Sequence, residues 1–467
     1  MFRSHILYMK LFEEICVGLL LLPVAPLWSQ VDATPTVPVP AVTGAAPASS
    51  SDQMMTPPPV SGQSYPTAPT AGERSNYLRG GVAFASAYTD NALGSVNGHP
   101  ISDVSYSIWP TLALDESTSR LHIVSTYAPG YTFYQRETYL NEANQTAAID
   151  LQYRLSPHVS MSARDGFQKT SNVFNQPDPT SAFAVSGGTQ QANFSVIAPI
   201  ADLLSNAGNV GITWQFAANA MVGASGTFAN LHYPNQAEVP GLFDSSSQGG
   251  SVFFTHRISK MHYVGATYQY QRLVSYPTVG QNETQTHALL FFYTLYASSR
   301  LSLSFFGGPQ YANVGPQYIN VQTAAAPGSQ SWNPQVGGSM GWQGRLTNVA
   351  ISYSHMISGG GGLIGAVKLD RTTASIRQQM TRRLSGSIAA GYAQNNVLGS
   401  ALLGNDNGHT LSATASLQQQ FGERVSLQLG YTRLHQDYSG VAVLAETPNT
   451  NSEFVSISYR FYRSLGR

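Results

Sequence analysis

A strict two-residue alternation of apolar and polar side chains runs through most of this sequence. The last segment shows it clearly, because Val455, Ile457 and Tyr459 alternate with Ser456 and Ser458. The same alternation recurs in other segments: 104–114, 411–418 and 425–432. Successive side chains of a β-strand point to opposite faces, so each segment predicts a strand with one apolar and one polar face.

The apolar faces of these strands need apolar surroundings, which either a second sheet or a lipid bilayer supplies. Length favours the bilayer, because many segments extend over about 10–14 residues, against about 5–6 for a soluble strand. Charged residues make up only 10% of the chain, and the mean hydropathy is −0.12. After residue 30 there is no run of about 20 apolar residues, the length that a membrane helix needs. A closed β-barrel crosses a bilayer with such segments, because inter-strand hydrogen bonds satisfy its backbone.

The connections between the alternating segments sort by length. Short turns are expected near 115–116, 156–157, 217–218, 259–260, 298–299, 345, 382–383 and 422–423. Long polar loops are expected around 89–101, 135–142, 168–206, 232–249, 274–283, 311–330, 358–366, 396–408 and 438–450. Alternating short turns and long loops are typical of membrane barrels, whose short turns face the periplasm. The sequence therefore predicts an all-β fold: a transmembrane antiparallel up-and-down β-barrel of about 18 strands (roughly 16–20), with both termini periplasmic.

The region before the first alternating segment carries two other patterns. Residues 1–29 are similar to a signal peptide, because Arg3 and Lys10 precede a short apolar run. Residues 30–76 are rich in Pro, Ala and Thr and are expected to form a disordered periplasmic segment, since they cannot bury enough apolar surface to fold. This segment is either a spacer or a tether to the cell wall or to a periplasmic partner. The barrel is expected over residues 77–467.

Charge and cysteine content exclude several kinds of partner. Lys and Arg together number 24, as do Asp and Glu, so nucleic acid is not an expected partner. The single cysteine, Cys16, lies in the predicted signal peptide, so the exported chain has no thiol chemistry. The segment 405–408 has a calcium-loop composition but lacks the closing bidentate acid. We expect no cofactor and no metal.

The alternating strands, export signal and Pro-rich lead-in together resemble a porin-type bacterial outer-membrane β-barrel. Phrases such as 430–433 (GYTR) and 265–270 (GATYQY) resemble uncharacterised outer-membrane barrel proteins of similar length. The resemblance covers residues 77–463 and implies two partners, the lipid of the outer membrane and the outer-membrane barrel assembly machinery. Such barrels usually end on an aromatic residue, whereas here Phe461 is followed by further residues up to Arg467.

The serine and histidine residues do not indicate catalysis. Residues 337–341 (GGSMG) match the G-x-S-x-G nucleophile pattern, but they lie within an alternating segment instead of at a strand-to-helix turn. His122 and Ser125 are three residues apart in a predicted strand, so they point to opposite faces. His158 and His355 have serines nearby but no recognisable orienting partner. We therefore expect no enzyme and no catalytic residue, and a barrel-scaffold hydrolase is the least favoured alternative.

Charged residues on the polar face of the predicted strands are candidates for lining a pore. The candidates are Asp150, Arg154, Arg164, Arg377 and Arg460. Asp150, for example, alternates with the apolar Ile149 and Leu151. A charge that faces lipid near the bilayer centre costs about 2–4 kcal/mol, so the inward direction is favoured. Inward charges set charge selectivity or bind an anionic solute; alternatively, opposite charges pair along the wall and only stabilise the barrel.

The sequence predicts a porin-like channel for the diffusion of small hydrophilic solutes, because a barrel of this size encloses an aqueous lumen. The alternative is a plugged or gated barrel for export of a surface polymer such as an exopolysaccharide, or for envelope structure. Residues 30–76 distinguish the two functions, since a simple porin has no need of such a segment.

Overall fold

The computed structural model describes most of the chain after residue 75. The described residues are 76–92, 100–170, 201–234, 236, 242–277, 280–298, 300–316, 327–360, 364–398, 407–438 and 449–464. The predicted signal peptide 1–29, which includes Cys16, lies outside these residues, and so does the predicted disordered segment 30–76 except for Asn76.

Eighteen β-strands follow one another along the described residues, as predicted. They are β1 (Tyr77–Thr89), β2 (Asp103–Ser117), β3 (Leu121–Tyr134), β4 (Glu142–Arg154), β5 (Val159–Thr170), β6 (Leu203–Ala217), β7 (Ala220–His232), β8 (Asp244–Arg257), β9 (His262–Tyr276), β10 (Asn282–Tyr296), β11 (Leu301–Val314), β12 (Ser329–Gln343), β13 (Thr347–Gly360), β14 (Ile364–Gln379), β15 (Leu384–Val397), β16 (Gly408–Phe421), β17 (Val425–Tyr438) and β18 (Asn449–Ser464). A short 3-10 helix, η1 (Thr138–Leu140), lies between β3 and β4. In the described part of the chain, no helix has the length and apolar character to cross a membrane.

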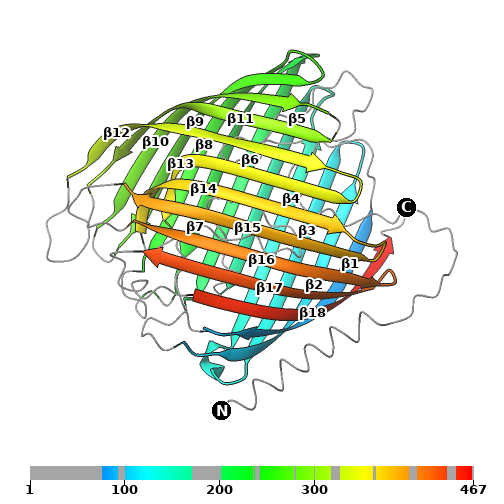
Figure 1. Ribbon diagram of the computed structural model, residues 1–467. Helices are drawn as coiled ribbons and strands as arrows, with labels where there is room; N and C mark the ends of the chain where they lie inside the picture. Colours follow the sequence, from blue (N-terminus) through cyan, green and yellow to red (C-terminus); the bar gives the residue numbers. More distant parts are fainter. Residues whose placement is uncertain are drawn as a thin grey trace. The chain divides into compact units, whose positions relative to one another are not determined.

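The strands form one closed sheet. Each strand pairs antiparallel with the next strand of the chain, so the spatial order follows the sequence order. β18 then pairs antiparallel with β1, from Tyr77 opposite Ser464 to Thr89 opposite Ser452. Figure 1 shows this closure, with β1 in blue beside β18 in red. The chain is therefore an up-and-down antiparallel barrel without a free sheet edge, as expected for a barrel that spans a membrane.

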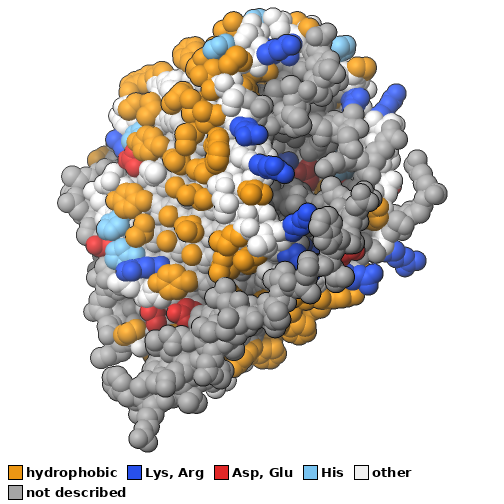
Figure 2. Space-filling view, turned by 45° about the vertical axis from the view of Figure 1, so that its right-hand side comes forward, with side chains coloured by type: hydrophobic (Ala, Val, Ile, Leu, Met, Phe, Trp, Pro, Cys, Tyr) orange, Lys and Arg blue, Asp and Glu red, His pale blue; other side chains and the backbone are white. Residues whose placement is uncertain are grey.

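The two faces of the wall differ in the way that the alternation predicts. On β10, Leu289 and Phe291 are 45% and 59% exposed on the outside, whereas Leu290 and Phe292 are 0% and 3% exposed on the inside. Figure 2 shows hydrophobic side chains spread over the outer wall, with charged side chains gathered toward its edges. An apolar outer wall matches the hydrocarbon core of a bilayer.

Short turns close one end of the barrel, here called the turn end, and side-chain hydroxyls fix several of them. After β2, Thr118 Oγ1 accepts hydrogen bonds from the backbone N–H of Arg120 (3.4 Å) and of Leu121 (3.0 Å). The same pair of bonds forms at other turns, on Ser156, Ser298 and Thr381. Hydroxyls of Ser and Thr stabilise tight turns in this way. The turn expected at 115–116 begins later, because β2 continues to Ser117.

The opposite end of the barrel carries the longer connections and is here called the loop end. Both chain termini of the barrel lie at the turn end, because Tyr77 begins β1 opposite the last residue of β18, Ser464. An up-and-down barrel with an even number of strands has both termini at the same end, as predicted.

Candidate permeation pathway

The structure places the five candidate pore-lining residues on the inner face of the wall. On β4, Asp150 and Arg154 lie out of phase with Ile149, which is exposed on the outer face. The other three are likewise out of phase with exposed residues of their own strands: Arg164 with Met161, Arg377 with Ile376, and Arg460 with Ile457 and Tyr459. Their role in lining a conducting pore stays a prediction.

Two of these candidates form an ion pair with each other. Asp150 and Arg164 are register partners on β4 and β5, and Arg164 Nε lies 2.6 Å from Asp150 Oδ2. About a third of each side chain is exposed, at 33% for Arg164 and 32% for Asp150. Ion pairs with this degree of exposure contribute only about 0–1 kcal/mol to stability. This pair therefore fits the alternative in which opposite charges pair along the wall and only stabilise the barrel.

A second group of charges on the inner face was not predicted from the sequence. Asp115 of β2 accepts a hydrogen bond from Arg79 of β1 (Nη2 to Oδ2, 3.1 Å), and its Oδ1 lies 3.2 Å from His122 Nε2 of β3. The inward direction of Arg79 could have been predicted from the alternation along β1, because Arg79 is out of phase with the exposed Phe84. The sequence predicts a turn at Asp115, so the inward direction of this residue on β2 was not predicted.

Arginine exceeds acid on the inner face. The described strands place these charged residues inward: Arg79, Arg154, Arg164, Arg257, Arg371, Arg377 and Arg460, and the acids Asp103, Asp115, Glu142 and Asp150. Asp103 accepts hydrogen bonds from the backbone N–H groups of Arg136 and Glu137, so it supports a loop. Among the described residues, Arg154, Arg377 and Arg460 take part in no ion pair. The inner wall formed by the described strands therefore has a positive surplus.

Most of these charges lie on one side of the ring of strands. β18 and β1 to β5 are consecutive neighbours, and they carry Arg460, Arg79, Asp115, Asp150, Arg154 and Arg164. We call this stretch of inner wall the charged arc. Arg79, Arg154 and Arg460 each lie in the half of their strand that is nearer the turn end. The positive surplus of the charged arc is therefore largest toward the turn end.

The inner wall of β7 to β11 carries one charged residue in its described strands, Arg257, and is partly apolar. Met221, Phe253, Leu290 and Phe292 form one buried cluster, with Phe306 packed against it. The rings of Phe253, Phe292 and Phe306 occupy the space that a Cβ would take at Gly223, Gly265 and Gly337. A side chain at any of these three positions would overlap a ring, so glycine is required there. Residues 288–293 are apolar on both faces, because outward apolar residues alternate with residues of this inner cluster.

A buried apolar cluster occupies the loop end of the lumen. It combines residues from both sides of the ring, Ala201, Leu203, Leu231, Tyr233 and Leu242 near β6 to β8, and Val367, Leu369, Ala393 and Tyr438 on β14, β15 and β17. These two sides lie about half a turn of the ring apart. Leu203 is only 2% exposed and Leu369 only 1%, although both face the lumen. We call this group the closing cluster, because its inward side chains are shielded from water.

Hydrogen bonds anchor one side of the closing cluster. Tyr438 Oη accepts a hydrogen bond from Asn395 Nδ2 (2.6 Å) and lies 2.8 Å from Thr410 Oγ1. These bonds satisfy a buried hydroxyl, which would otherwise destabilise the cluster. On the other side, just beyond β7, burial and the nearby Asp244 raise the pKa of Tyr233 well above its usual range.

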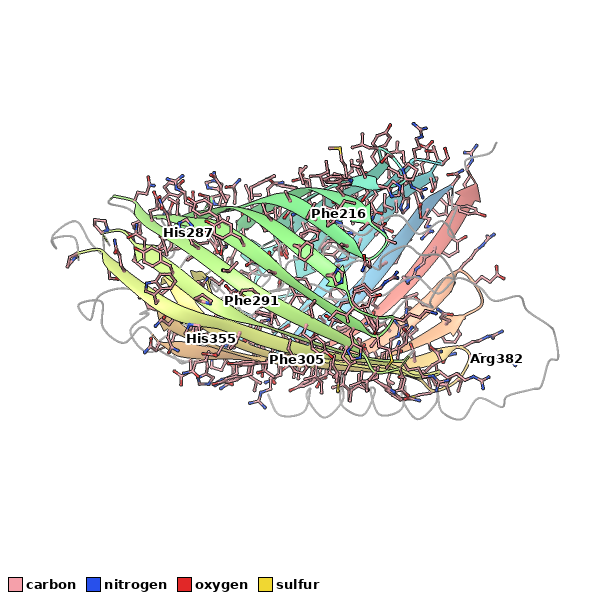
Figure 3. All side chains as sticks on the ribbon, turned by 90° about the horizontal axis from the view of Figure 1, so that it is seen from above. Phe216, His287, Phe291, Phe305, His355 and Arg382 are labelled. Carbon is pink, nitrogen blue, oxygen red and sulfur yellow. The ribbon has the colours of Figure 1, made fainter. Side chains whose placement is uncertain are left out.

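A second, smaller apolar cluster is also buried. It consists of Leu273, Ala312, Val314, Ile357 and Leu398, and it also lies toward the loop end. In Figure 3, His287 and His355 mark the loop end of the wall, and Arg382 marks the turn end. The inside of the barrel therefore changes along its axis from a polar, positively charged turn end to an apolar loop end.

The residues considered for catalysis are not brought together. Ser339 lies within β12, between the inward Gly337 and Gly341, so no strand-to-helix elbow surrounds it. His122 faces inward with Asp115, whereas Ser125 is out of phase with it on β3. Among the described residues, no group of three His, Cys, Asp or Glu side chains is placed to hold a metal ion.

Comparisons with known proteins give only distant structural similarity. No protein-family model and no curated protein matches the sequence. The chain is similar in structure to OccAB4 of Acinetobacter baumannii (TM-score 0.40, 9% identity, 83% of this chain and 99% of that chain). It is also similar to the outer membrane protein OpdK of Pseudomonas aeruginosa (0.41, 8%, 83% and 99%) and to the siderophore receptor PirA of the same organism (0.38, 11%, 83% and 81%). Similarity at this level does not extend to function.

Proposed function

We propose that this chain is an outer-membrane channel for small hydrophilic solutes that favours anions and closes at its loop end. The observation that carries the proposal is the surplus of arginine on the inner face, where Arg154, Arg377 and Arg460 have no ion-pair partner among the described residues. A ring of 18 strands is wide enough to enclose an aqueous lumen. Fixed positive charges inside such a lumen raise the local concentration of anions.

The architecture supports a place in the bacterial outer membrane. Closed barrels with an apolar outer wall span that membrane, with short turns toward the periplasm and long loops toward the outside. In this orientation the charged arc opens toward the periplasm and the closing cluster lies near the cell surface. Export by the predicted signal peptide 1–29 and insertion by the barrel assembly machinery belong to the same proposal.

The closing cluster favours a gated barrel over a permanently open porin. Apolar constrictions block ions because water leaves them, even where atoms do not fill them completely. The same closure suits the second candidate function, a gated barrel that exports a surface polymer. Deletion of residues 30–76 separates the two functions, because it leaves solute uptake intact in a channel and abolishes polymer export in an exporter.

Uptake into liposomes that contain the full chain tests the proposal. Gluconate, glucose and glucosamine are similar in size and differ in charge. We expect gluconate to enter faster than glucose, and glucosamine to enter most slowly, because the arginine surplus attracts anions and repels cations. Uptake no faster than in protein-free liposomes, or fastest uptake of glucosamine, would contradict the proposal. Heat-modifiable mobility in gels confirms that the barrel is folded in each preparation.

A further inference from the structure

One tryptophan faces the lumen within the charged arc. Trp109 of β2 is out of phase with Tyr106 and Ile108, which are exposed on the outer face. The other tryptophans of the described residues are exposed on the outer face: Trp214, Trp332 and Trp342. Outward tryptophans suit the membrane interface, whereas Trp109 faces away from lipid and is only partly buried. Trp109 therefore offers a ring surface to solutes in the lumen.

Small residues of β1 lie beside this ring. Ala83 is the register partner of Trp109, and Gly81 lies on the same face two residues nearer the turn end. The Trp109 ring leans the other way, toward β3, where it occupies the space that a Cβ would take at Gly130. A solute can therefore approach the backbone of β1 at Ala83 and Gly81 without meeting a large side chain of that strand.

An arginine and a hydroxyl group converge at Gly81. Its Cβ position lies 2.9 Å from Thr111 Oγ1 on β2 and 3.8 Å from Arg460 Cγ on β18. Thr111 is exposed and Arg460 partly exposed, and Arg460 takes part in no ion pair among the described residues. The nearby Arg79 is held by Asp115 (Nη2 to Oδ2, 3.1 Å), so Arg460 is the cation available to a solute.

The distance between the ring and the arginine limits what can contact both. Gly130 and Gly81 lie on β3 and β1, which are two inter-strand spacings apart, about 9.6 Å. An occupant that stacks on Trp109 and pairs with Arg460 therefore needs a spacer between its ring and its anionic group. This spacer lies beside the Thr111 hydroxyl, which can donate and accept hydrogen bonds.

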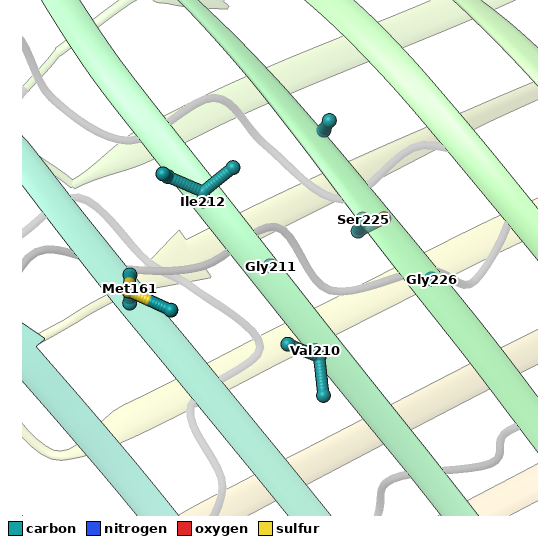
Figure 4. Close-up of a pocket in the computed structure, with 7 residues that line it drawn as sticks. Met161, Val210, Gly211, Ile212, Ser225 and Gly226 are labelled. Carbon is teal, nitrogen blue, oxygen red and sulfur yellow. The ribbon is translucent and has the colours of Figure 1, made fainter.

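The hollow on the outer wall between β5 and β7 lacks this combination. Met161, Val210 and Ile212 line it together with small residues, and none of its lining residues is charged (Figure 4). An apolar hollow of this kind indicates no particular ligand. The inner surface at Trp109, in contrast, combines a ring, a hydroxyl group and a charge.

We propose that this part of the charged arc binds nucleoside monophosphates. The base stacks on Trp109, the ribose lies over Ala83 beside the Thr111 hydroxyl, and the phosphate pairs with Arg460. The ribose is the required spacer, and the phosphate carries the charge that the arginine surplus attracts. This inference rests on the proposed function, since it places a solute-binding site inside the proposed channel.

Equilibrium dialysis of the full chain, folded in detergent, tests this site with three probes. AMP carries all three groups, adenosine lacks the phosphate, and ribose 5-phosphate lacks the base. We expect AMP to bind about tenfold more tightly than either fragment, because each fragment loses one of the two main contacts. Trp109→Leu and Arg460→Gln should each weaken AMP binding by about tenfold for the same reason.

Matched variants on the outer wall separate the site from general effects on the barrel. Trp332→Leu and Arg433→Gln remove the same side chains where they face away from the lumen, so they should leave AMP binding unchanged. The inference is overturned if ribose 5-phosphate binds as tightly as AMP, or if Trp109→Leu binds AMP as tightly as Trp332→Leu. Dialysis requires no conduction, so absence of AMP binding together with normal uptake of gluconate refutes the site and not the channel.

Discussion

The double substitution Leu203→Ser and Leu369→Ser is expected to raise the fraction of time that the barrel conducts by about a hundredfold. Both leucines are almost completely buried in the closing cluster. Burial of one leucine side chain contributes about 1.5–3 kcal/mol. If opening exposes both side chains, serine removes roughly 3 kcal/mol of preference for the closed state, and each 1.4 kcal/mol is a factor of about ten. Single-channel recording measures the open fraction directly.

The control for this prediction uses leucines on the other face of the wall. Leu289 and Leu417 lie on the outer face of the wall, and each is 45% exposed. Leu289→Ser and Leu417→Ser therefore make the same two replacements of leucine by serine, but outside the closing cluster. An equal rise of the open fraction in the control, or no rise in the Leu203 and Leu369 variant, would show that the cluster does not close the lumen.

Neutralising the unpaired arginines is expected to remove the preference for anions. In water, one charge acts on an ion about 10 Å away with about 0.4 kcal/mol. Arg154→Gln, Arg377→Gln and Arg460→Gln together therefore change the relative free energies of anion and cation by at least about 1 kcal/mol, which is about fivefold in permeability ratio. The reversal potential in a salt gradient measures this ratio. The effect should shrink in about 1 M salt, where charges are screened within about 3 Å.

An arginine on the outer wall provides the matched control for selectivity. Arg433 of β17 is exposed and in phase with the outward-facing Tyr431. Arg433→Gln removes the same charge from the chain but not from the lumen, so the reversal potential should stay unchanged. If the triple variant keeps the reversal potential of the unmodified chain, these arginines do not control the passage of ions.

The barrel itself could be predicted from the sequence because its signal is local. Alternation with a period of two fixes which residues of a strand share a face, and the lengths of the connections fix the order of the strands. The inward positions of Arg154 and Arg460 follow from the same parity. The apolar inner face of residues 288–293 could not be explained from the sequence, because it packs against the rings of Phe253 and Phe306 on other strands.

The closing cluster could not be predicted from the sequence because it combines residues far apart in the chain. Leu203 and Leu369 each fit an ordinary strand, and nothing local indicates that β6 and β14 contribute to one cluster. The group of Arg79, Asp115 and His122 was missed for a simpler reason. Its central carboxylate was assigned to a turn, so its parity was not considered.

The most direct test is a planar-bilayer recording of the full chain in a salt gradient, alongside the Leu203→Ser and Leu369→Ser variant. We predict discrete, infrequent openings of the unmodified chain, frequent openings of the variant, and an anion-selective reversal potential in both. The contrary result is a folded, inserted barrel that passes no current in either form, and it would show that the polar lumen is not a conducting channel.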